Sequence, residues 1–180
     1  MRGPLAGVIG TLVTIIGFAL SVTTTRSKPT QAYIQPEAHT AEYQTALFEA
    51  SRVYGKAGCG NMQLAEMTAE HAIRSGLPAQ LIAAQIATES TCNPLAVSNR
   101  GAIGLRQVVP KIWAKTYDFS KINLFNPSDN MAVADNITVE LVKKYGIRGG
   151  LIHYYGTGND GIGQSGAVYA ERVLKLAGKI

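Results

Sequence analysis

Residues 84–110 read AQIATESTCNPLAVSNRGAIGLRQVVP, and this stretch decides the fold. Apolar residues upstream continue into it at helical spacing, and Pro78 favours a helix start. The spacing predicts a helix that ends near Glu89, followed by a polar loop with glycines at positions 101 and 104. At a helix C-terminus among aliphatic neighbours, carbonyl dipoles and burial both raise a carboxyl pKa. Glu89 therefore has the properties that a general acid requires.

The motifs in and after this stretch resemble a known family. They are Glu89-Ser90, Asn93-Pro94, the run from Gly101 to Leu105 with Gln107, Leu124-Phe125-Asn126-Pro127 and, more loosely, His153-Tyr154-Tyr155-Gly156. Over roughly residues 70 to 175 their order is similar to that of the soluble-lytic-transglycosylase-like (SLT) domain of peptidoglycan lytic transglycosylases. The resemblance implies a mainly α (α+β), lysozyme-like fold and an enzyme that cleaves cell-wall glycan.

The resemblance also implies a mechanism with one carboxyl group. Glu89 would protonate the glycosidic oxygen between N-acetylmuramic acid and N-acetylglucosamine and then accept the C6 hydroxyl proton, which gives 1,6-anhydromuramyl ends. A hydrolytic lysozyme is the alternative, and it would need a second carboxylate. The candidates carry no obvious site context; they are Asp118, Asp129, Asp135 and Asp160. A further alternative is a catalytically silent glycan-binding or structural component that keeps the fold.

Three further residues align with family positions that contact the sugar or orient the catalytic carboxyl: Ser98, Gln107 and Tyr154. Ser98 alone is equally typical of a loop turn. Two residues depart from the family pattern. Arg106 stands where the family usually has Met, and we expect it to contact an anionic peptide stem or to face solvent. Tyr155 stands where the family usually has Asn, so Tyr154 is the better site candidate.

The glycines of the loop have an expected role of their own. Gly101 and Gly104 should adopt backbone conformations that other residues resist and should let a sugar approach the main chain. Asp129 is expected to flank the start of the helix that follows Pro127.

The two cysteines, Cys59 and Cys92, form neither a metal-ligand spacing nor a nucleophile constellation. In an oxidising compartment they would pair, which contributes about 3 to 4 kcal/mol in the chain-entropy model. Two separate buried thiols are the alternative, and the sequence leaves both open. No cofactor and no metal is expected.

Helical periodicity and capping residues predict a chain made mainly of helices. The expected helices cover residues 41–54, 61–76, the segment ending near Glu89, a short piece near 107–115, and then 128–145, 151–155 and 166–177. No segment is typical of a long strand, and the loop after Glu89 is expected to form at most a small irregular β region.

The first residues form a separate segment. Residues 5–22, LAGVIGTLVTIIGFALSV, carry no charge and are long enough to cross a membrane. We expect an uncleaved anchor, with cleavage after Ser21 as the alternative. Residues 1–24 are thus an anchor or signal, residues 25–40 a linker, and residues 41–180 the catalytic domain. The anchor would lie in the host inner membrane, or in a virion membrane if the chain is viral, and the catalytic domain would face the periplasm and cell wall.

The formal net charge of +5 favours an anionic polymer or a membrane surface as partner. Peptidoglycan glycan strands with their peptide carboxylates meet that requirement. Nucleic acid is not expected, because the basic residues are scattered and the aromatic residues few. The size suggests local opening of the wall, for a secretion or conjugation machine or for a bacteriophage that enters or leaves its host.

Overall fold

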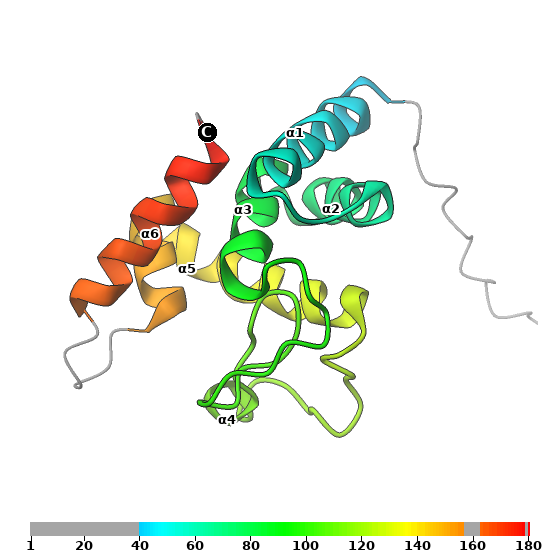
Figure 1. The fold of residues 1–180 in the computed structure, drawn as a ribbon. Coiled ribbons are helices and arrows are strands. Elements are labelled where there is room, and N and C mark those ends of the chain that lie inside the picture. Colours follow the sequence, from blue (N-terminus) through cyan, green and yellow to red (C-terminus); the bar gives the residue numbers. More distant parts are fainter. Residues whose placement is uncertain (1–39, 157–162, 179) are drawn as a thin grey trace, which may run out of the picture. The chain divides into compact units, whose positions relative to one another are not determined.

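The computed structural model describes residues 40–156, 163–178 and 180, all of which belong to the unit Ile34–Ile180. The described part is mainly helical (Figure 1). Its helices are α1 (Ala41–Ala57), α2 (Met62–Ser75), α3 (Ala79–Ser90), α4 (Pro110–Trp113), α5 (Pro127–Tyr155) and α6 (Gly163–Ala177). The mainly helical class predicted from the sequence is confirmed for this part of the chain.

The first two helices begin and end where their capping residues stand. Thr40 caps α1 by accepting a hydrogen bond from the Tyr43 amide at 3.1 Å, and Asn61 caps α2 by accepting one from the Leu64 amide at 2.9 Å. Gly58 ends α1 in the left-handed conformation. Helix α1 therefore runs one turn beyond its predicted end, because Gly58, and not Gly55, supplies the left-handed cap.

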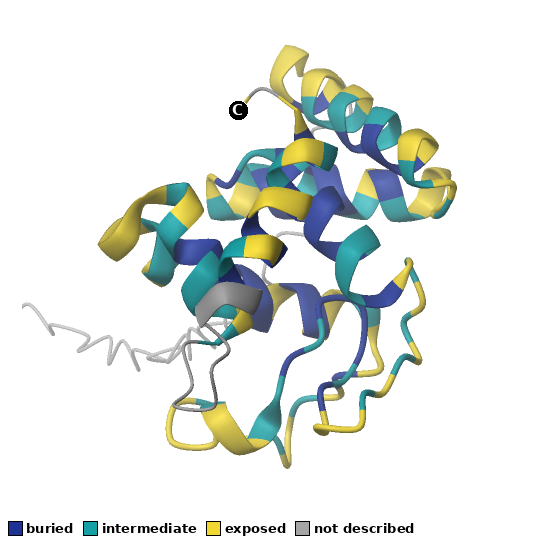
Figure 2. Ribbon diagram, turned by 60° about the vertical axis from the view of Figure 1, so that its left-hand side comes forward, coloured by how far each residue is buried: buried dark blue, intermediate teal, exposed yellow. Residues whose placement is uncertain are grey.

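Helix α3 is the centre of the core. It contacts α1, α2 and α6, and its residues 81–86 are all buried. Figure 2 shows buried residues on the surfaces where the helices meet. A helix surrounded in this way is apolar on nearly every side, which explains the run of aliphatic residues before Glu89. The end of α3 is thereby fixed relative to three other helices.

Helix α5 joins two segments that the sequence predicts as separate helices. Gly146 interrupts it with φ 69° and ψ 172°, and the helix resumes and continues to Tyr155. The break expected after residue 145 is real, but the second segment starts earlier than predicted. Helix α6 also starts three residues before its predicted first residue, and the short helix α4 is confined to Pro110–Trp113.

The loop between α3 and α4 forms an irregular region at one end of the helical bundle (Figure 1). Ile103 makes isolated antiparallel bridges to Val97 and to Val108. The small irregular β region expected after Glu89 is therefore present. A disulfide joins Cys59, before α2, to Cys92, at the start of this loop, so the pairing that the sequence left open is made.

Within residues 40–156, 163–178 and 180, no helix combines the length and the apolar character needed to cross a membrane. The predicted anchor at residues 5–22 and the linker up to residue 39 lie outside the described residues.

Candidate active site

Glu89 lies in the last turn of α3, where the helix meets the irregular loop. Thr91 ends the helix in the left-handed conformation, and the Ser90 hydroxyl donates to the Ile86 carbonyl at 3.0 Å. Burial raises the pKa of Glu89 to about 7, while a hydrogen bond from Tyr169 and the charge of Arg106 act in the opposite direction. The raised pKa expected from the sequence is confirmed, and burial is its main cause.

The Glu89 carboxyl opens into a cleft of about 480 Å³. The cleft lies between the loop after α3 and the end of α5, and its side chains are polar, aromatic and aliphatic. It is lined by Glu89, Ser98, Asn99, Arg100, Ala102, Gln107, Val108, Val109, Ile112, Trp113, His153, Tyr154, Tyr155 and Gly156. The four residues that the sequence assigned to the site, Glu89, Ser98, Gln107 and Tyr154, are brought together here.

Ser98 and Gln107 shape the loop wall of this cleft. The Ser98 hydroxyl accepts hydrogen bonds from the amides of Ala102 at 3.0 Å and Arg100 at 3.3 Å, so it has the turn-forming role that the sequence left open. The Gln107 amide donates to the carbonyls of Gly104 at 3.0 Å and Ala96 at 3.2 Å. These bonds leave the Gln107 carbonyl oxygen as an acceptor and the Ser98 proton as a donor for a ligand.

The backbone of Gln107 has φ 49°, a conformation that side chains other than glycine rarely adopt. Such strained positions are concentrated at functional sites. The surrounding hydrogen bonds hold Gln107 in this conformation at the cleft wall.

Tyr154 forms the opposite wall from α5. Its hydroxyl donates to the Arg106 carbonyl at 2.8 Å, and burial raises its pKa. His153 stacks on Tyr145 with ring centroids 3.8 Å apart, and the exposed Tyr155 stacks on Tyr169 at 5.0 Å. Tyr154 therefore joins the wall of the cleft to the main chain of the loop.

Comparison with known families identifies this arrangement. Residues 66–171, more than half of the chain, match the family described as the transglycosylase SLT domain. The chain belongs to this SLT family. The family consists of lytic transglycosylases that act on peptidoglycan, and the domain accordingly binds peptidoglycan. No curated protein matches the chain.

Within the SLT domain, Arg106 is not where the sequence placed it. Its side chain is completely buried, so it neither faces solvent nor contacts a peptide stem in the cleft. It forms an ion pair with Asp135 and donates to Gln85 and Thr138, each at 2.6 Å. The expectation was wrong because the partners lie 21 to 32 residues away along the chain.

These groups form one assembly, which we call the buried charge cluster: His71, Gln85, Arg106, Asp135 and Thr138. The second Asp135 oxygen accepts a hydrogen bond from His71 Nδ1 at 2.7 Å. The cluster joins α2, α3 and α5 to the loop. Its sequence signal was weak, because isolated polar residues in apolar helices do not reveal which of them meet.

The aspartates considered as the second carboxylate of a hydrolase do not line the cleft among the described residues. Asp135 belongs to the buried charge cluster. Asp118 is exposed, bonds to Ser120 and Lys121, and borders another hollow near α4. Asp129 lies in the first turn of α5 and accepts from the Asn123 amide at 3.1 Å, so its expected helix-flanking role is confirmed. Asp160 lies outside the described residues.

The two loop glycines of the SLT domain differ from each other. Both have positive φ, 76° at Gly101 and 79° at Gly104, as expected. A side chain at Gly101 would meet open space, whereas one at Gly104 would collide with Asn130 and the Leu124 carbonyl. Gly104 therefore allows close packing inside the domain, and the prediction that it lets a sugar approach was wrong.

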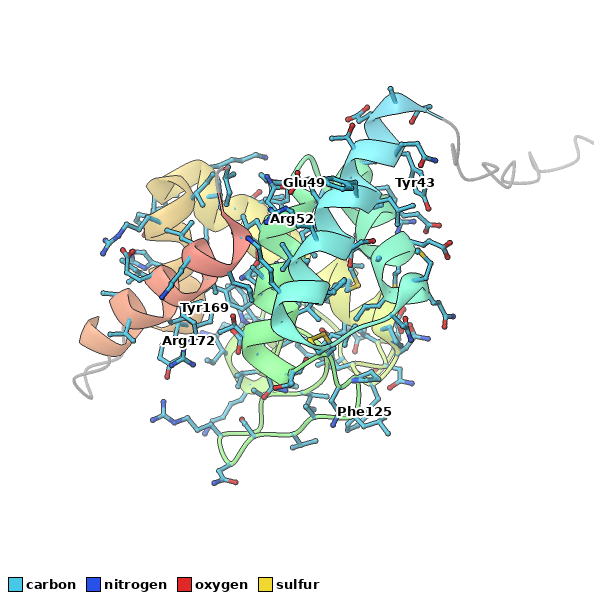
Figure 3. The ribbon with its side chains drawn as sticks, turned by 45° about the horizontal axis from the view of Figure 1, so that its top comes forward. Tyr43, Glu49, Arg52, Phe125, Tyr169 and Arg172 are labelled. Carbon is cyan, nitrogen blue, oxygen red and sulfur yellow. A yellow bond between two sulfur atoms is a disulfide. The ribbon has the colours of Figure 1, made fainter. Side chains whose placement is uncertain are left out.

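Tyr169 is a site residue that the sequence did not reveal. It reaches from α6 towards α3 (Figure 3), where it bonds to Glu89 and to Gln85. It is 5% exposed, and in the sequence it is one aromatic residue in the apolar stripe of a helix. Only the packing of α6 on α3 brings it to the carboxyl.

Among the described residues, no group of three or more His, Cys, Asp or Glu side chains could hold a metal ion.

Proposed function

We propose that this SLT domain cleaves the β-1,4 bond between N-acetylmuramic acid and N-acetylglucosamine and leaves 1,6-anhydromuramyl ends. Glu89 first donates a proton to the glycosidic oxygen. It then accepts the proton of the C6 hydroxyl, whose oxygen attacks the anomeric carbon with assistance from the N-acetyl group. One carboxyl group thus serves both steps, and no water is consumed.

The observation that carries this proposal is the half-buried position of Glu89 with a pKa of about 7. Near neutral pH such a group is present in both protonation states, so it can act as acid and as base. A glutamate with an ordinary pKa would be almost fully ionised there and would be a poor acid.

The composition of the cleft supports a transglycosylase over a hydrolytic lysozyme. Among the described residues that line it, Glu89 is the one carboxylate. A hydrolase that uses two carboxylates would need a second one beside the scissile bond. Asp135 is unsuited to that role, because Arg106 and His71 occupy its oxygens.

Ser98, Gln107 and Tyr154 are proposed to hold the sugar. The Ser98 hydroxyl and the Gln107 carbonyl offer one donor and one acceptor from the loop, while the Tyr154 ring offers an apolar surface from α5. Polar groups on one wall and an aromatic ring on the other are suited to a pyranose ring, which has polar edges and apolar faces.

The test is mass spectrometry of the muropeptides that the full-length protein releases from purified peptidoglycan in ¹⁸O-labelled water. Anhydro products without label, absent with Glu89→Gln, are expected. Labelled reducing ends would indicate a lysozyme and direct attention to Asp160. Binding without any product from the unaltered protein would favour a silent glycan-binding component.

We further propose that residues 5–22 anchor the domain to a membrane and that the domain faces the cell wall. The uncharged length of the segment and the polar residues after it support this arrangement. Such a tethered enzyme would open the wall locally for an envelope machine or a bacteriophage. Membrane fractionation with protease protection of the C-terminal domain tests the topology.

A further inference from the structure

A series of hydrogen bonds connects Arg106 to Glu89 through two intermediate side chains. Arg106 Nη2 lies 2.6 Å from Gln85 Oε1. Gln85 Nε2 lies 3.4 Å from the Tyr169 hydroxyl, and Tyr169 bonds in turn to the Glu89 carboxyl. The series crosses from the loop through α3 to α6 and returns to the last turn of α3.

The chemistry of the groups fixes the direction of every bond in this series. A guanidinium can only donate, so the Gln85 oxygen must face Arg106 and the Gln85 NH₂ must face Tyr169. The Tyr169 oxygen therefore accepts from Gln85. Its own proton remains for Glu89, so the series ends with an O–H donor aimed at the carboxyl.

The start of the series is held rigidly. The other guanidinium nitrogen is paired with Asp135, and Nη2 also donates to Thr138 at 2.6 Å. The main chain of Arg106 is held too, because its amide donates to Asn130 at 2.9 Å and its carbonyl accepts from Tyr154 at 2.8 Å. Arg106 and Gln85 are completely buried, so water does not compete for these bonds.

We propose that Arg106 is a positioning residue for the acid and base Glu89: it orients Gln85 and, through Gln85, makes the Tyr169 hydroxyl donate a hydrogen bond to the Glu89 carboxylate. The catalytic use of Glu89 rests on the proposed function. The orientation of the series is a property of the folded domain, independent of any substrate.

The groups around Glu89 allow the direction of the effect to be worked out. Tyr169 on α6 and Arg106 on the loop stabilise its charged form. From α5, Tyr154 and the Asp135 charge face the same region, and His153 and Arg100 line the cleft. Arg106 is thus the cation of the cluster whose charge opposes the effect of burial on the pKa of Glu89.

Around Arg106 itself the other titratable groups are Tyr54 on α1 and His71 on α2. Burial raises the pKa of Tyr54, and a hydrogen bond with Thr68 and the charge of Arg106 act in the opposite direction. His71 reaches Arg106 only through Asp135. Neither group belongs to the series that leads to Glu89.

Without the guanidinium, the Gln85 amide is free to turn its oxygen towards Tyr169. Tyr169 can then donate to Gln85, and the Glu89 carboxylate loses its donor. A nearby positive charge is lost as well. Both changes make Glu89 hold its proton more tightly.

The experiment is an NMR titration of the full-length, substrate-free protein with ¹³C-labelled glutamate carboxyls, in which Glu89→Gln identifies the Glu89 signal. We expect Arg106→Met and Gln85→Leu each to raise the Glu89 titration midpoint by about one pH unit. Arg106→Lys keeps the charge and a donor and should shift it less. Arg74→Met, which removes an exposed ion pair within α2 outside the series, is the matched control.

Gln85→Leu keeps the Arg106–Asp135 pair, so it tests the proposal even where Arg106→Met does not fold. Unchanged midpoints in folded Gln85→Leu and Arg106→Met would overturn the proposal and leave the cluster a purely structural role. Because no substrate is present, this outcome is independent of product chemistry. A shifted midpoint in a protein that makes no anhydro product would instead contradict the proposed function alone.

Discussion

The cleft at Glu89 and the buried charge cluster at Asp135 each contain one carboxylate, but different groups surround the two carboxylates. Glu89 is half-buried, opens into the cleft and receives a bond from the neutral Tyr169. Asp135 is buried against the Arg106 guanidinium and His71. The first carboxyl therefore faces the cleft, whereas the two oxygens of the second are bonded to Arg106 and His71.

The difference shows how one small bundle supports both chemistry and structure. A buried carboxyl without a cation at its oxygens has a raised pKa, and a directly paired one is stabilised as an anion. The two regions meet at Arg106, which pairs directly with Asp135 and is connected to Glu89 by hydrogen bonds through Gln85 and Tyr169. The charge of Arg106 lowers the pKa of Glu89, but burial of the carboxyl has the larger effect and raises it.

The comparison predicts opposite outcomes for activity when either carboxylate is made neutral. Glu89→Gln should lower the rate of muropeptide release about 100- to 10,000-fold, the usual contribution of a general acid. Asp135→Asn keeps a hydrogen-bond acceptor for Arg106 and should retain activity within about tenfold. Initial rates of the two variants on the same peptidoglycan preparation test this prediction. Glu171→Gln, which changes an exposed ion pair on α6, is the control. Equal losses would remove the distinction between the two regions.

For the free energy of unfolding we expect the larger loss from substitution of Asp135. Asp135→Ala leaves the Arg106 charge buried without its carboxylate and should lower the free energy of unfolding by about 3 to 5 kcal/mol. Arg106→Met combined with Asp135→Leu leaves neither charge behind and should recover most of that loss. Urea denaturation of the three proteins checks this prediction. A double variant as unstable as Asp135→Ala would show that the charges themselves are not responsible.

Alanine substitutions at Gly104 and Gly101 test how tightly the loop packs against α5. Gly104→Ala pushes a methyl group against Asn130, the side chain that holds the Arg106 amide, and should cost about 3 kcal/mol. Gly101→Ala has the same left-handed backbone but open space around it, so about 1 kcal/mol is expected. Thermal unfolding measures both. Similar losses would mean that backbone strain alone accounts for them.

The last prediction concerns the pH dependence of stability. Glu89 has a folded pKa of about 7 against 4.5 for an exposed glutamate, so the folded protein binds this proton more tightly. Its contribution to stability is present in full below pH 4.5 and is lost as the pH rises through 7. Contact with the open cleft reduces the effect to on the order of 2 kcal/mol.

Urea denaturation between pH 4.5 and 8 should therefore show a decline with rising pH that Glu89→Gln lacks. Parallel curves for the two proteins would contradict the raised pKa. Asp135→Asn should not remove this decline, because we expect the pH dependence to come from Glu89 in the cleft and not from the buried charge cluster.

Local signals in the sequence were sufficient to predict the helices and the four residues that the structure brings together at the cleft. The caps at Thr40 and Asn61 and the apolar run before Glu89 depend on neighbours within four residues, so they can be read along the chain. The short motifs around Ser98, Gln107 and Tyr154 likewise placed these residues at one cleft. The end of α1 was misplaced because Gly55 and Gly58 offer the same signal, and only the folded backbone chooses between them.

The sequence by itself determined a helical domain of the SLT family with a glutamate, Glu89, at the end of a buried helix. Only the tertiary structure decided that Arg106 points inward, that Tyr169 contacts Glu89 and that Cys59 is bonded to Cys92. Their partners lie between 21 and 84 residues away along the chain. The physical reason is that periodicity and capping record local contacts, whereas a buried charge is stable only beside partners that the packing of separate helices brings to it.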